Sequence, residues 1–218
     1  MKKVYFIILL IAAIIPSIAQ NAGKNDPDAK VILDGVSTKF KGFKTAKATF
    51  TYKVENSSGK VLSSKTGTVY MKGIKYQVSI VGQEIFCDGQ NIWTFDKSAN
   101  EVTITAFDSE STTLTPQKLF TNFYDQDFLY KLNGEKKQGT KTIQEIEMTP
   151  TDKSKPFHKV YIYIDKVGKT INSTRVLEKS GSRYSYIVNT LLPNSAIADS
   201  QFAFDAKKYP GVEVIDLR

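Results

Sequence analysis

The chain has 218 residues and a formal net charge of +8, from 30 Lys and Arg against 22 Asp and Glu. Its single Cys excludes an internal disulfide framework, so stability must come from a hydrophobic core. The basic residues are spread along the chain and include few Arg, which disfavours a nucleic-acid-binding protein.

The chain begins with the pattern of a secretory signal peptide, residues 1–19. Lys2 and Lys3 precede an unbroken apolar run from Val4 to Ile15, and a small residue follows at Ala19. The run is about a dozen residues, whereas a membrane-spanning helix needs roughly 20. We therefore expect export and cleavage after Ala19. No Cys lies near the expected cut, so we do not expect a lipid anchor.

After a flexible mature N-terminus, residues 20–25, we expect one domain, residues 26–218, that opens with an amphipathic helix. Asp26 can cap the helix, and Pro27 suits its first position, where no backbone donor is needed. Gly42 is a suitable stop. Between them the apolar residues recur at helical spacing, which predicts a helix over residues 27–41.

Beyond this helix the apolar period changes to two, which predicts β-strands. Turn sequences rich in Gly, Asn, Asp and Ser separate short strands at hairpin spacing. A second helix is predicted to begin at Thr115-Pro116, with Leu119, Phe120 and Phe123 on one face. The predicted strands cover residues 47–54, 61–71, 75–80, 84–87, 92–95, 102–106, 128–132, 142–149, 159–165, 170–178 and 184–191.

This order of elements predicts a mainly β fold of the α+β class. We expect a single curled antiparallel sheet that forms a half-closed barrel, with a helical lid over its open side. No shift in composition marks a second domain.

The sequence offers little for catalysis. His158 is the single His, and an isolated His is more often a surface residue than a general base. Cys87 lies in a predicted strand and is expected to pack as a small apolar group. Together they cannot form a zinc site, and neither a G-x-S-x-G elbow nor a phosphate-binding loop is present. We expect no enzyme, cofactor or metal, although a site built from carboxylates alone stays open.

Aromatic residues are numerous, with 13 Phe, 11 Tyr and one Trp. Most suit strand propensity and core packing. A barrel of this size can also hold one small ligand. A filled core and an apolar cavity use the same residue types, so spacing leaves both alternatives open.

The segment from Glu84 to Asp96, with its Asp88-Gly89 turn and Trp-x-Phe strand, resembles a pattern of the LolA outer-membrane lipoprotein carriers. Val102-Thr103 lies where that family has a Val-Thr strand. The opening helix, which runs into the strand at Lys47–Tyr52, is also similar. So are the closing segments Ser200–Phe204 and Pro210–Val214. The resemblance covers nearly the whole expected mature chain.

The resemblance implies a monomeric periplasmic carrier that shields the acyl chains of lipoproteins. An inner-membrane ABC transporter would release lipoproteins to it, and an outer-membrane acceptor or the membrane itself would receive them. The resemblance implies no cofactor. The residues that we expect to line the acyl-chain cavity are Ile32, Val36, Phe50, Tyr52, Tyr76, Val78, Trp93, Phe95, Leu119 and Phe123.

The chain departs from the family at Met71–Lys75, which lacks the Arg and Pro that many members have after the second strand. That Arg helps to latch the lid in the family. Lys72 is the nearest replacement, but an ammonium lacks the planar fork of a guanidinium.

Three other functions remain open from sequence. The chain can be a related binding module, either a lipoprotein acceptor or an envelope-stress sensor. It can also be a periplasmic hydrolase that uses carboxylates, or a structural envelope protein. The missing anchor Cys disfavours the acceptor, and the absence of a second domain disfavours the sensor.

Overall fold

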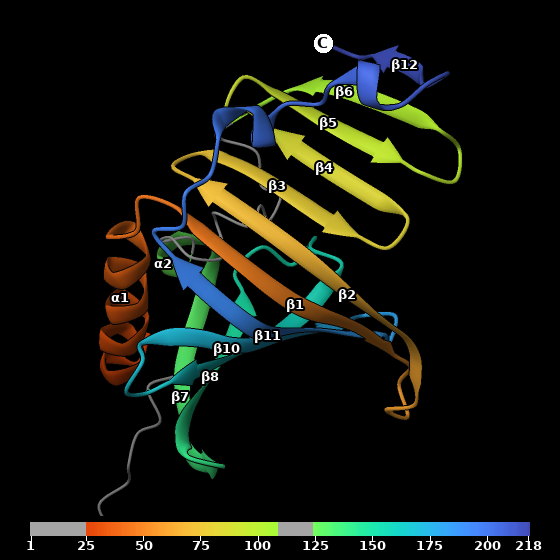
Figure 1. Cartoon of the computed structure of the whole chain (residues 1–218). Coiled ribbons are helices and arrows are strands. Elements are labelled where there is room, and N and C mark those ends of the chain that lie inside the picture. The colour runs from red at the N-terminus through yellow and green to blue at the C-terminus, as the bar shows by residue number, and fades with distance from the viewer. Residues whose placement is uncertain (1–24, 109–123) are drawn as a thin grey trace, which may run out of the picture.

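The computed structural model describes residues 25–108 and 124–218, and it shows one curled, open sheet with a helix packed against it (Figure 1). The predicted signal peptide and the predicted helix that begins at Thr115-Pro116 lie outside the described residues. The elements are α1 (Pro27–Lys41), β1 (Ala46–Glu55), β2 (Val61–Lys72), β3 (Lys75–Ile80), β4 (Gln83–Cys87), β5 (Asn91–Asp96), β6 (Glu101–Ala106), α2 (Tyr124–Asp127), β7 (Phe128–Gln138), β8 (Lys141–Pro150), β9 (Phe157–Asp165), β10 (Thr170–Glu178), β11 (Arg183–Pro193), η2 (Asp199–Phe202), η3 (Ala206–Lys208) and β12 (Glu213–Asp216).

The 12 described strands follow the order β12-β6-β5-β4-β3-β2-β1-β11-β10-β9-β8-β7. Each neighbouring pair is antiparallel except β12 and β6, which are parallel. Two meanders, β1–β6 and β7–β11, are therefore joined where β1 pairs with β11. The predicted curled antiparallel sheet is confirmed.

Helix α1 has the bounds that its sequence predicts. The Asp26 carboxylate accepts hydrogen bonds from the backbone N–H of Asp28 at 2.9 Å and of Ala29 at 3.4 Å, which satisfies two free donors of the first turn. At the other end, Gly42 is the C-cap residue. The helix lies beside β7 and β10, and its apolar side faces the sheet.

Hydrogen bonds at Asp26 join the start of α1 to β7. The Leu132 backbone N–H donates to Asp26 Oδ2 at 2.9 Å, and the Asp26 N–H donates to the Tyr130 carbonyl at 3.1 Å.

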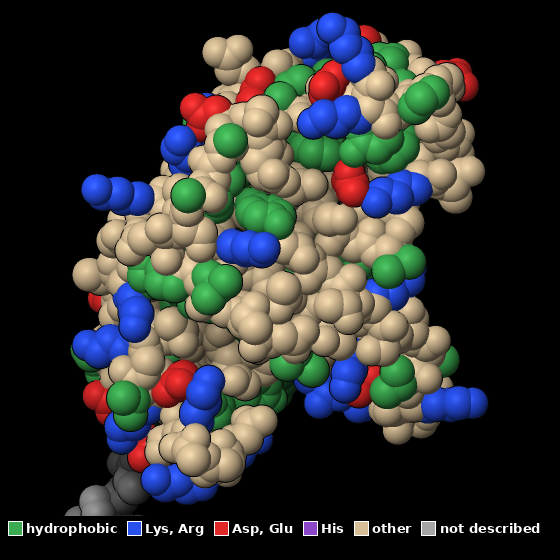
Figure 2. Space-filling model, viewed as in Figure 1, with side chains coloured by type: hydrophobic (Ala, Val, Ile, Leu, Met, Phe, Trp, Pro, Cys, Tyr) green, Lys and Arg blue, Asp and Glu red, His purple; other side chains and the backbone are tan. Residues whose placement is uncertain are grey.

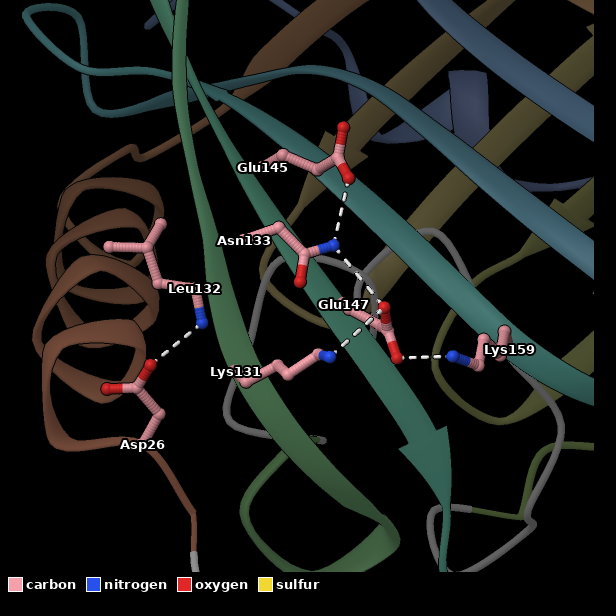
Figure 3. A network of polar contacts seen from close by, with 7 residues as sticks. All are labelled: Asp26, Lys131, Leu132, Asn133, Glu145, Glu147 and Lys159. Carbon is pink, nitrogen blue, oxygen red and sulfur yellow. Dashed lines mark hydrogen bonds and ion pairs between the residues drawn. The ribbon is translucent and has the colours of Figure 1, made fainter. Parts of the chain in front are cut away.

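A polar network on β7–β9 lies near the bond between Leu132 and Asp26, as Figure 3 shows. In this network the Glu147 carboxylate binds Lys159 and accepts from Asn133 Nδ2 at 3.3 Å. Burial opposes the charge of Glu147, but these partners hold the pKa of its carboxyl below its usual value.

Register and strand alternation give the sheet two faces. The inner face carries α1 and includes Tyr130 of β7, Ile162 of β9 and Tyr76 of β3. The outer face includes Gln77 and Phe86, which are paired across β3 and β4. The C-terminal segment, residues 199–209, crosses this outer face at β3 and β4, in front of the sheet in Figure 1.

Aromatic packing holds the C-terminal segment on the outer face. Phe202 is fully buried, and the Phe204 ring lies 5.8 Å from the Phe86 ring and 5.5 Å from the Phe95 ring. The Tyr209 hydroxyl donates to Glu84 Oε2 at 2.8 Å. This part of the sheet therefore has apolar side chains on both faces, because Tyr76 of β3 and Cys87 of β4 are buried on the inner face.

Candidate functional site

A first hydrophobic cluster lies on the inner face under α1. Ala29, Leu33 and Val36 of the helix pack there with Tyr124 of α2, and each of the four is at most 4% exposed. Burial of each Leu or Val side chain stabilises the fold by about 1.5–3 kcal/mol. The partly buried Ile32 packs against the same cluster. Its members from the sheet are Phe128, Tyr130, Ile146, Met148, Val160, Ile162, Ile164 and Ile171.

A hydrogen bond ties α2 to the polar side of α1 beside this cluster. The Tyr124 hydroxyl donates to Asp34 Oδ1 at 2.7 Å. This bond is the main reason that the pKa of the Asp34 carboxyl lies below its usual value, and Lys30 adds to the effect.

A second hydrophobic cluster lies on the inner face of β1–β4. Its buried members are Ala46, Ala48, Val69, Met71, Tyr76 and Cys87, and Val78 and Phe50 pack against it. Burial raises the pKa of the Cys87 thiol and of the Tyr76 hydroxyl, so both groups are neutral at ordinary pH. Cys87 is a free, buried Cys, as predicted.

Four aromatic side chains lie between the two clusters, where β1 meets β11. These seam aromatics are Phe50, Tyr52, Tyr184 and Tyr186. The Tyr52 ring lies 5.0 Å from the Tyr186 ring and is stacked on the Tyr184 ring at 6.0 Å, and the Phe50 and Tyr186 rings are 6.3 Å apart. The register pairs Tyr52 with Tyr186 and Val54 with Tyr184, which puts the seam aromatics on the inner face.

The seam aromatics differ from the clusters in their exposure. Tyr186 keeps 39% of its surface accessible, and the other three rings are half-buried. Burial, with the neighbouring Tyr186 and Tyr184, raises the pKa of Tyr52 to about 12, so its hydroxyl stays neutral. The group is thus an uncharged aromatic surface that stays partly open on the inner face, which suits contact with an apolar ligand rather than proton transfer.

The structure brings together six of the ten residues that we expected to line a cavity. Ile32 and Val36 belong to the first cluster, Tyr76 and Val78 to the second, and Phe50 and Tyr52 to the seam aromatics. The last four lie on the inner face of the sheet, and Ile32 and Val36 lie on the side of α1 that packs against that face. Leu119 and Phe123 lie outside the described residues.

Trp93 and Phe95 are not on that face, which corrects their predicted position. In the register of β4 and β5, Cys87 pairs with Ile92, while Phe86 pairs with Trp93. Side chains of directly paired residues lie on the same side of a sheet, so Trp93 and Phe95 share the outer face with Phe86. Phe95 is buried there, with its ring 4.4 Å from that of Tyr209.

Sequence reasoning missed Tyr184 and Tyr186. The strand that carries them was predicted, and Tyr184-Ser185-Tyr186 has the alternation of a half-buried strand. The missing information was the pairing of β11 with β1, two strands far apart in the chain.

Other residues with potential chemistry do not join this site. His158 is exposed near the start of β9. Lys72 Nζ lies 2.9 Å from Asp199 Oδ1, so its ion pair is with the C-terminal segment and not with α1. Within residues 25–108 and 124–218, no three His, Cys, Asp or Glu side chains are placed to hold a metal ion. None of the helices in these ranges is both long and apolar enough to cross a membrane.

The sequence comparisons match outer-membrane lipoprotein carrier proteins. The family model for the outer membrane lipoprotein carrier protein LolA matches residues 41–205. An outer-membrane lipoprotein carrier protein of Pseudomonas putida (strain W619) is 26% identical in an alignment of 180 residues, and the match covers 78% of this chain and 80% of that protein.

A solved structure shows the same fold at low identity. An uncharacterized conserved protein from Thermus thermophilus superposes with a TM-score of 0.59 at 13% identity, over 87% of this chain and 99% of its own. A LolA superfamily protein from Nitrosomonas europaea gives a TM-score of 0.42 at 13% identity, over 81% of this chain and 97% of its own.

Proposed function

Because the chain belongs to the LolA family of outer membrane lipoprotein carrier proteins, we propose that it binds the acyl chains of lipoproteins and carries them from the inner to the outer membrane. It would work in the periplasm after cleavage of residues 1–19. The single observation that supports this function best is the half-open group of seam aromatics on the inner face, between two apolar clusters.

The energetics of acyl transfer set what such a face must do. Each CH₂ of an acyl chain that leaves the membrane for water costs about 0.8 kcal/mol. A single long chain is therefore penalised by roughly 10 kcal/mol. A carrier has to offset much of that cost while keeping release fast, since near-complete burial of several chains approaches the tightest known affinities. A face that is only partly closed, like the one at Tyr186, suits this balance.

In this mechanism α1 works as a movable cover. Without cargo its apolar side packs on the first cluster, and with cargo the inner face and the helix contact acyl chains instead. The seam aromatics extend this apolar surface beyond the part that α1 covers. The partners would be an inner-membrane ABC transporter that releases lipoproteins and an outer-membrane acceptor or the membrane itself. No step needs a cofactor or a covalent bond.

Depletion of the protein tests this function in cells. The host is depleted of the chain, and its inner and outer membranes are separated by density. We expect lipoproteins to accumulate in the inner membrane and to return to the outer membrane when the full chain is supplied again. Normal sorting in cells that contain none of the protein contradicts the proposal. A hydrolase would instead leave sorting intact and alter envelope glycans or esters.

A further inference from the structure

Three loops meet at the end of the sheet where β1, β8 and β10 finish. The Arg183 guanidinium donates to the Ser57 carbonyl in the β1–β2 turn at 2.8 Å. The Lys179 backbone N–H donates to the Pro156 carbonyl of the β8–β9 loop at 2.9 Å. The β1–β2, β8–β9 and β10–β11 connections therefore form one continuous rim.

This rim carries an excess of positive charge. Residues 53–65, 151–156 and 178–183 contain seven basic side chains and only three acidic ones, Glu55, Asp152 and Glu178. Glu55 is already bound by Arg175. We call the seven the basic rim: Lys53, Lys60, Lys65, Lys153, Lys155, Lys179 and Arg183.

The lysines of the basic rim are only weakly compensated by carboxylates of the protein, of which Asp152 interacts electrostatically with Lys155 and Lys179. In the described part of the chain no salt bridge involves any of the six, whereas Lys30, Lys97 and Lys166 elsewhere do pair with carboxylates. Lys179 Nζ instead donates to a backbone carbonyl, that of Lys153, at 2.5 Å. An excess of positive charge at one end of a molecule favours association with an anionic partner.

Two exposed aliphatic side chains lie in the β1–β2 part of the basic rim, between Lys60 and Lys65 in the sequence. Val61 and Leu62 keep 48% and 61% of their surface accessible. They stand where β2 begins, next to the turn of the hairpin that extends beyond the rest of the sheet at the lower right of Figure 1. Figure 2 shows Lys and Arg side chains around the end of this hairpin. Apolar side chains flanked by lysines are typical of segments that bind at a lipid–water interface.

The basic rim also borders the seam aromatics. The register across β2, β1 and β11 places Lys65, Tyr52 and Tyr186 in one row on the inner face. Tyr184 pairs with Val54, close to the turn. The partly open end of the inner face thus lies beside the lysines and the exposed Val61 and Leu62.

We propose that this rim docks the protein on an anionic lipid bilayer, with Lys60, Lys65 and Lys179 against the headgroups and Val61 and Leu62 inserted among them. The proposal rests on the carrier function, because it gives acyl chains a short path between the membrane and the seam aromatics. A bilayer fits better than an acidic protein because the projecting Val61 and Leu62 can enter headgroups without movement of the sheet.

Vesicle co-sedimentation tests the proposal, with protein purified from the envelope of cells that express the full chain. We expect it to sediment with vesicles of phosphatidylglycerol mixed equally with phosphatidylcholine, to remain free with phosphatidylcholine alone, and to dissociate in high salt. The triple variant Lys60→Glu, Lys153→Glu, Lys179→Glu, which leaves Lys65 beside the seam aromatics unchanged, should lower the partition coefficient at least about tenfold. The double variant Val61→Ser, Leu62→Ser should also lower it.

The matched control reverses three exposed lysines far from the rim, Lys137→Glu, Lys207→Glu and Lys208→Glu, and should bind at least ten times better than the rim variant. Equal losses in the two triple variants, or a parent that ignores anionic vesicles, overturn the proposal. So does a rim variant that changes only self-association or binding to an acidic protein. Binding of a soluble lipopeptide should be unchanged in the rim variants, so failure of docking and failure of the carrier function give different results.

Discussion

The Phe50 ring lies directly against Gly67, its partner on the neighbouring strand β2. A β-carbon at Gly67 would stand 2.4 Å from Phe50 Cζ and 2.8 Å from the Ser79 carbonyl oxygen. The absence of a side chain at Gly67 is therefore what allows the Phe50 ring to lie across β2. This contact fixes one side of the seam aromatics.

Replacement of this glycine should destabilise the protein. In Gly67→Ala the new methyl group must displace both the Phe50 ring and the backbone of β3, and such overpacking costs about 1–3 kcal/mol. Gly35→Ala is the matched control, since a β-carbon there meets only Lys169 Cδ at 3.7 Å and lies within α1. Alanine in that helix should stabilise by up to about 1 kcal/mol. Urea unfolding measures the free energy of unfolding of both variants. A Gly67→Ala variant as stable as the parent would contradict the close contact between the Phe50 ring and Gly67.

Asp26 should link the stability of α1 to pH. The Leu132 N–H bond, followed by those from Asp28 and Ala29, lowers the pKa of the Asp26 carboxyl from its usual 3.8. A depressed folded-state pKa adds stability above the unfolded pKa, and that stability is lost as pH falls through the folded value. Asp26→Ala should cost about 1–2 kcal/mol at neutral pH.

The difference in unfolding free energy between parent and Asp26→Ala should then shrink below about pH 4. Asp28→Ala is the control, because Asp28 accepts no capping bond from the helix and should cost at most about 0.5 kcal/mol. A difference between parent and Asp26→Ala that stays constant from neutral to acid pH shows that the charge of Asp26 does not contribute.

Cys87 should be inert in the folded protein. Its side chain is fully buried, and burial raises the pKa of its thiol, so the reactive thiolate is scarce. We expect a thiol reagent such as dithionitrobenzoate to label it only as fast as the protein opens. Labelling in urea should be complete and rapid. Equal labelling rates in the folded and unfolded protein would show that the second cluster does not protect this residue.

The C-terminal segment should be held by Phe202 rather than by its ion pair. Removing the fully buried Phe202 ring in Phe202→Ala should cost about 3–5 kcal/mol. Asp199 is bound by Lys72 and Lys75, but all three are exposed, and such pairs contribute roughly 0–1 kcal/mol. Thermal unfolding of the Phe202→Ala and Asp199→Ala variants measures the two losses of stability, and we expect the larger loss in Phe202→Ala. The reverse order would mean that the ion pair anchors the segment.

Local sequence signals were enough to predict α1 and most strands. The helix is capped by Asp26, begins with Pro27 and ends before Gly42, so it has the predicted bounds of residues 27–41. Alternating residues likewise marked the strands, although β7 runs to Gln138, beyond the predicted residue 132. Capping residues and alternating apolar residues are signals within one short segment, so they can be recognised in a single sequence.

The faces of the sheet needed information that is not local. Alternation shows that Trp93 and Phe95 lie on one side of β5, but the register with β4 decides which side, and it pairs Ile92 with Cys87. The prediction failed there because the C-terminal segment covers the outer face and makes that side apolar too. The parallel pairing of β12 with β6 and the pairing of Tyr186 with Tyr52 also depend on distant segments.

The most direct test of the carrier function compares the two faces in a displacement assay. An apolar fluorescent probe is bound to the purified protein and displaced with a triacylated lipopeptide. Phe50 and Trp93 are both half-buried aromatic residues, but only Phe50 lies on the inner face. A carboxylate on an apolar binding surface is costly to bury, so Phe50→Glu and Tyr186→Glu should weaken lipopeptide binding at least about tenfold.

Trp93→Glu, on the outer face, should bind the lipopeptide within about twofold of the parent, which is under about 0.5 kcal/mol. Circular dichroism and thermal unfolding confirm that each compared variant is folded. A carrier that holds acyl chains on its inner face should lose lipopeptide binding only in the folded inner-face variants. Lipopeptide affinity that falls equally in Trp93→Glu, or that survives unchanged in folded Phe50→Glu and Tyr186→Glu, would contradict it.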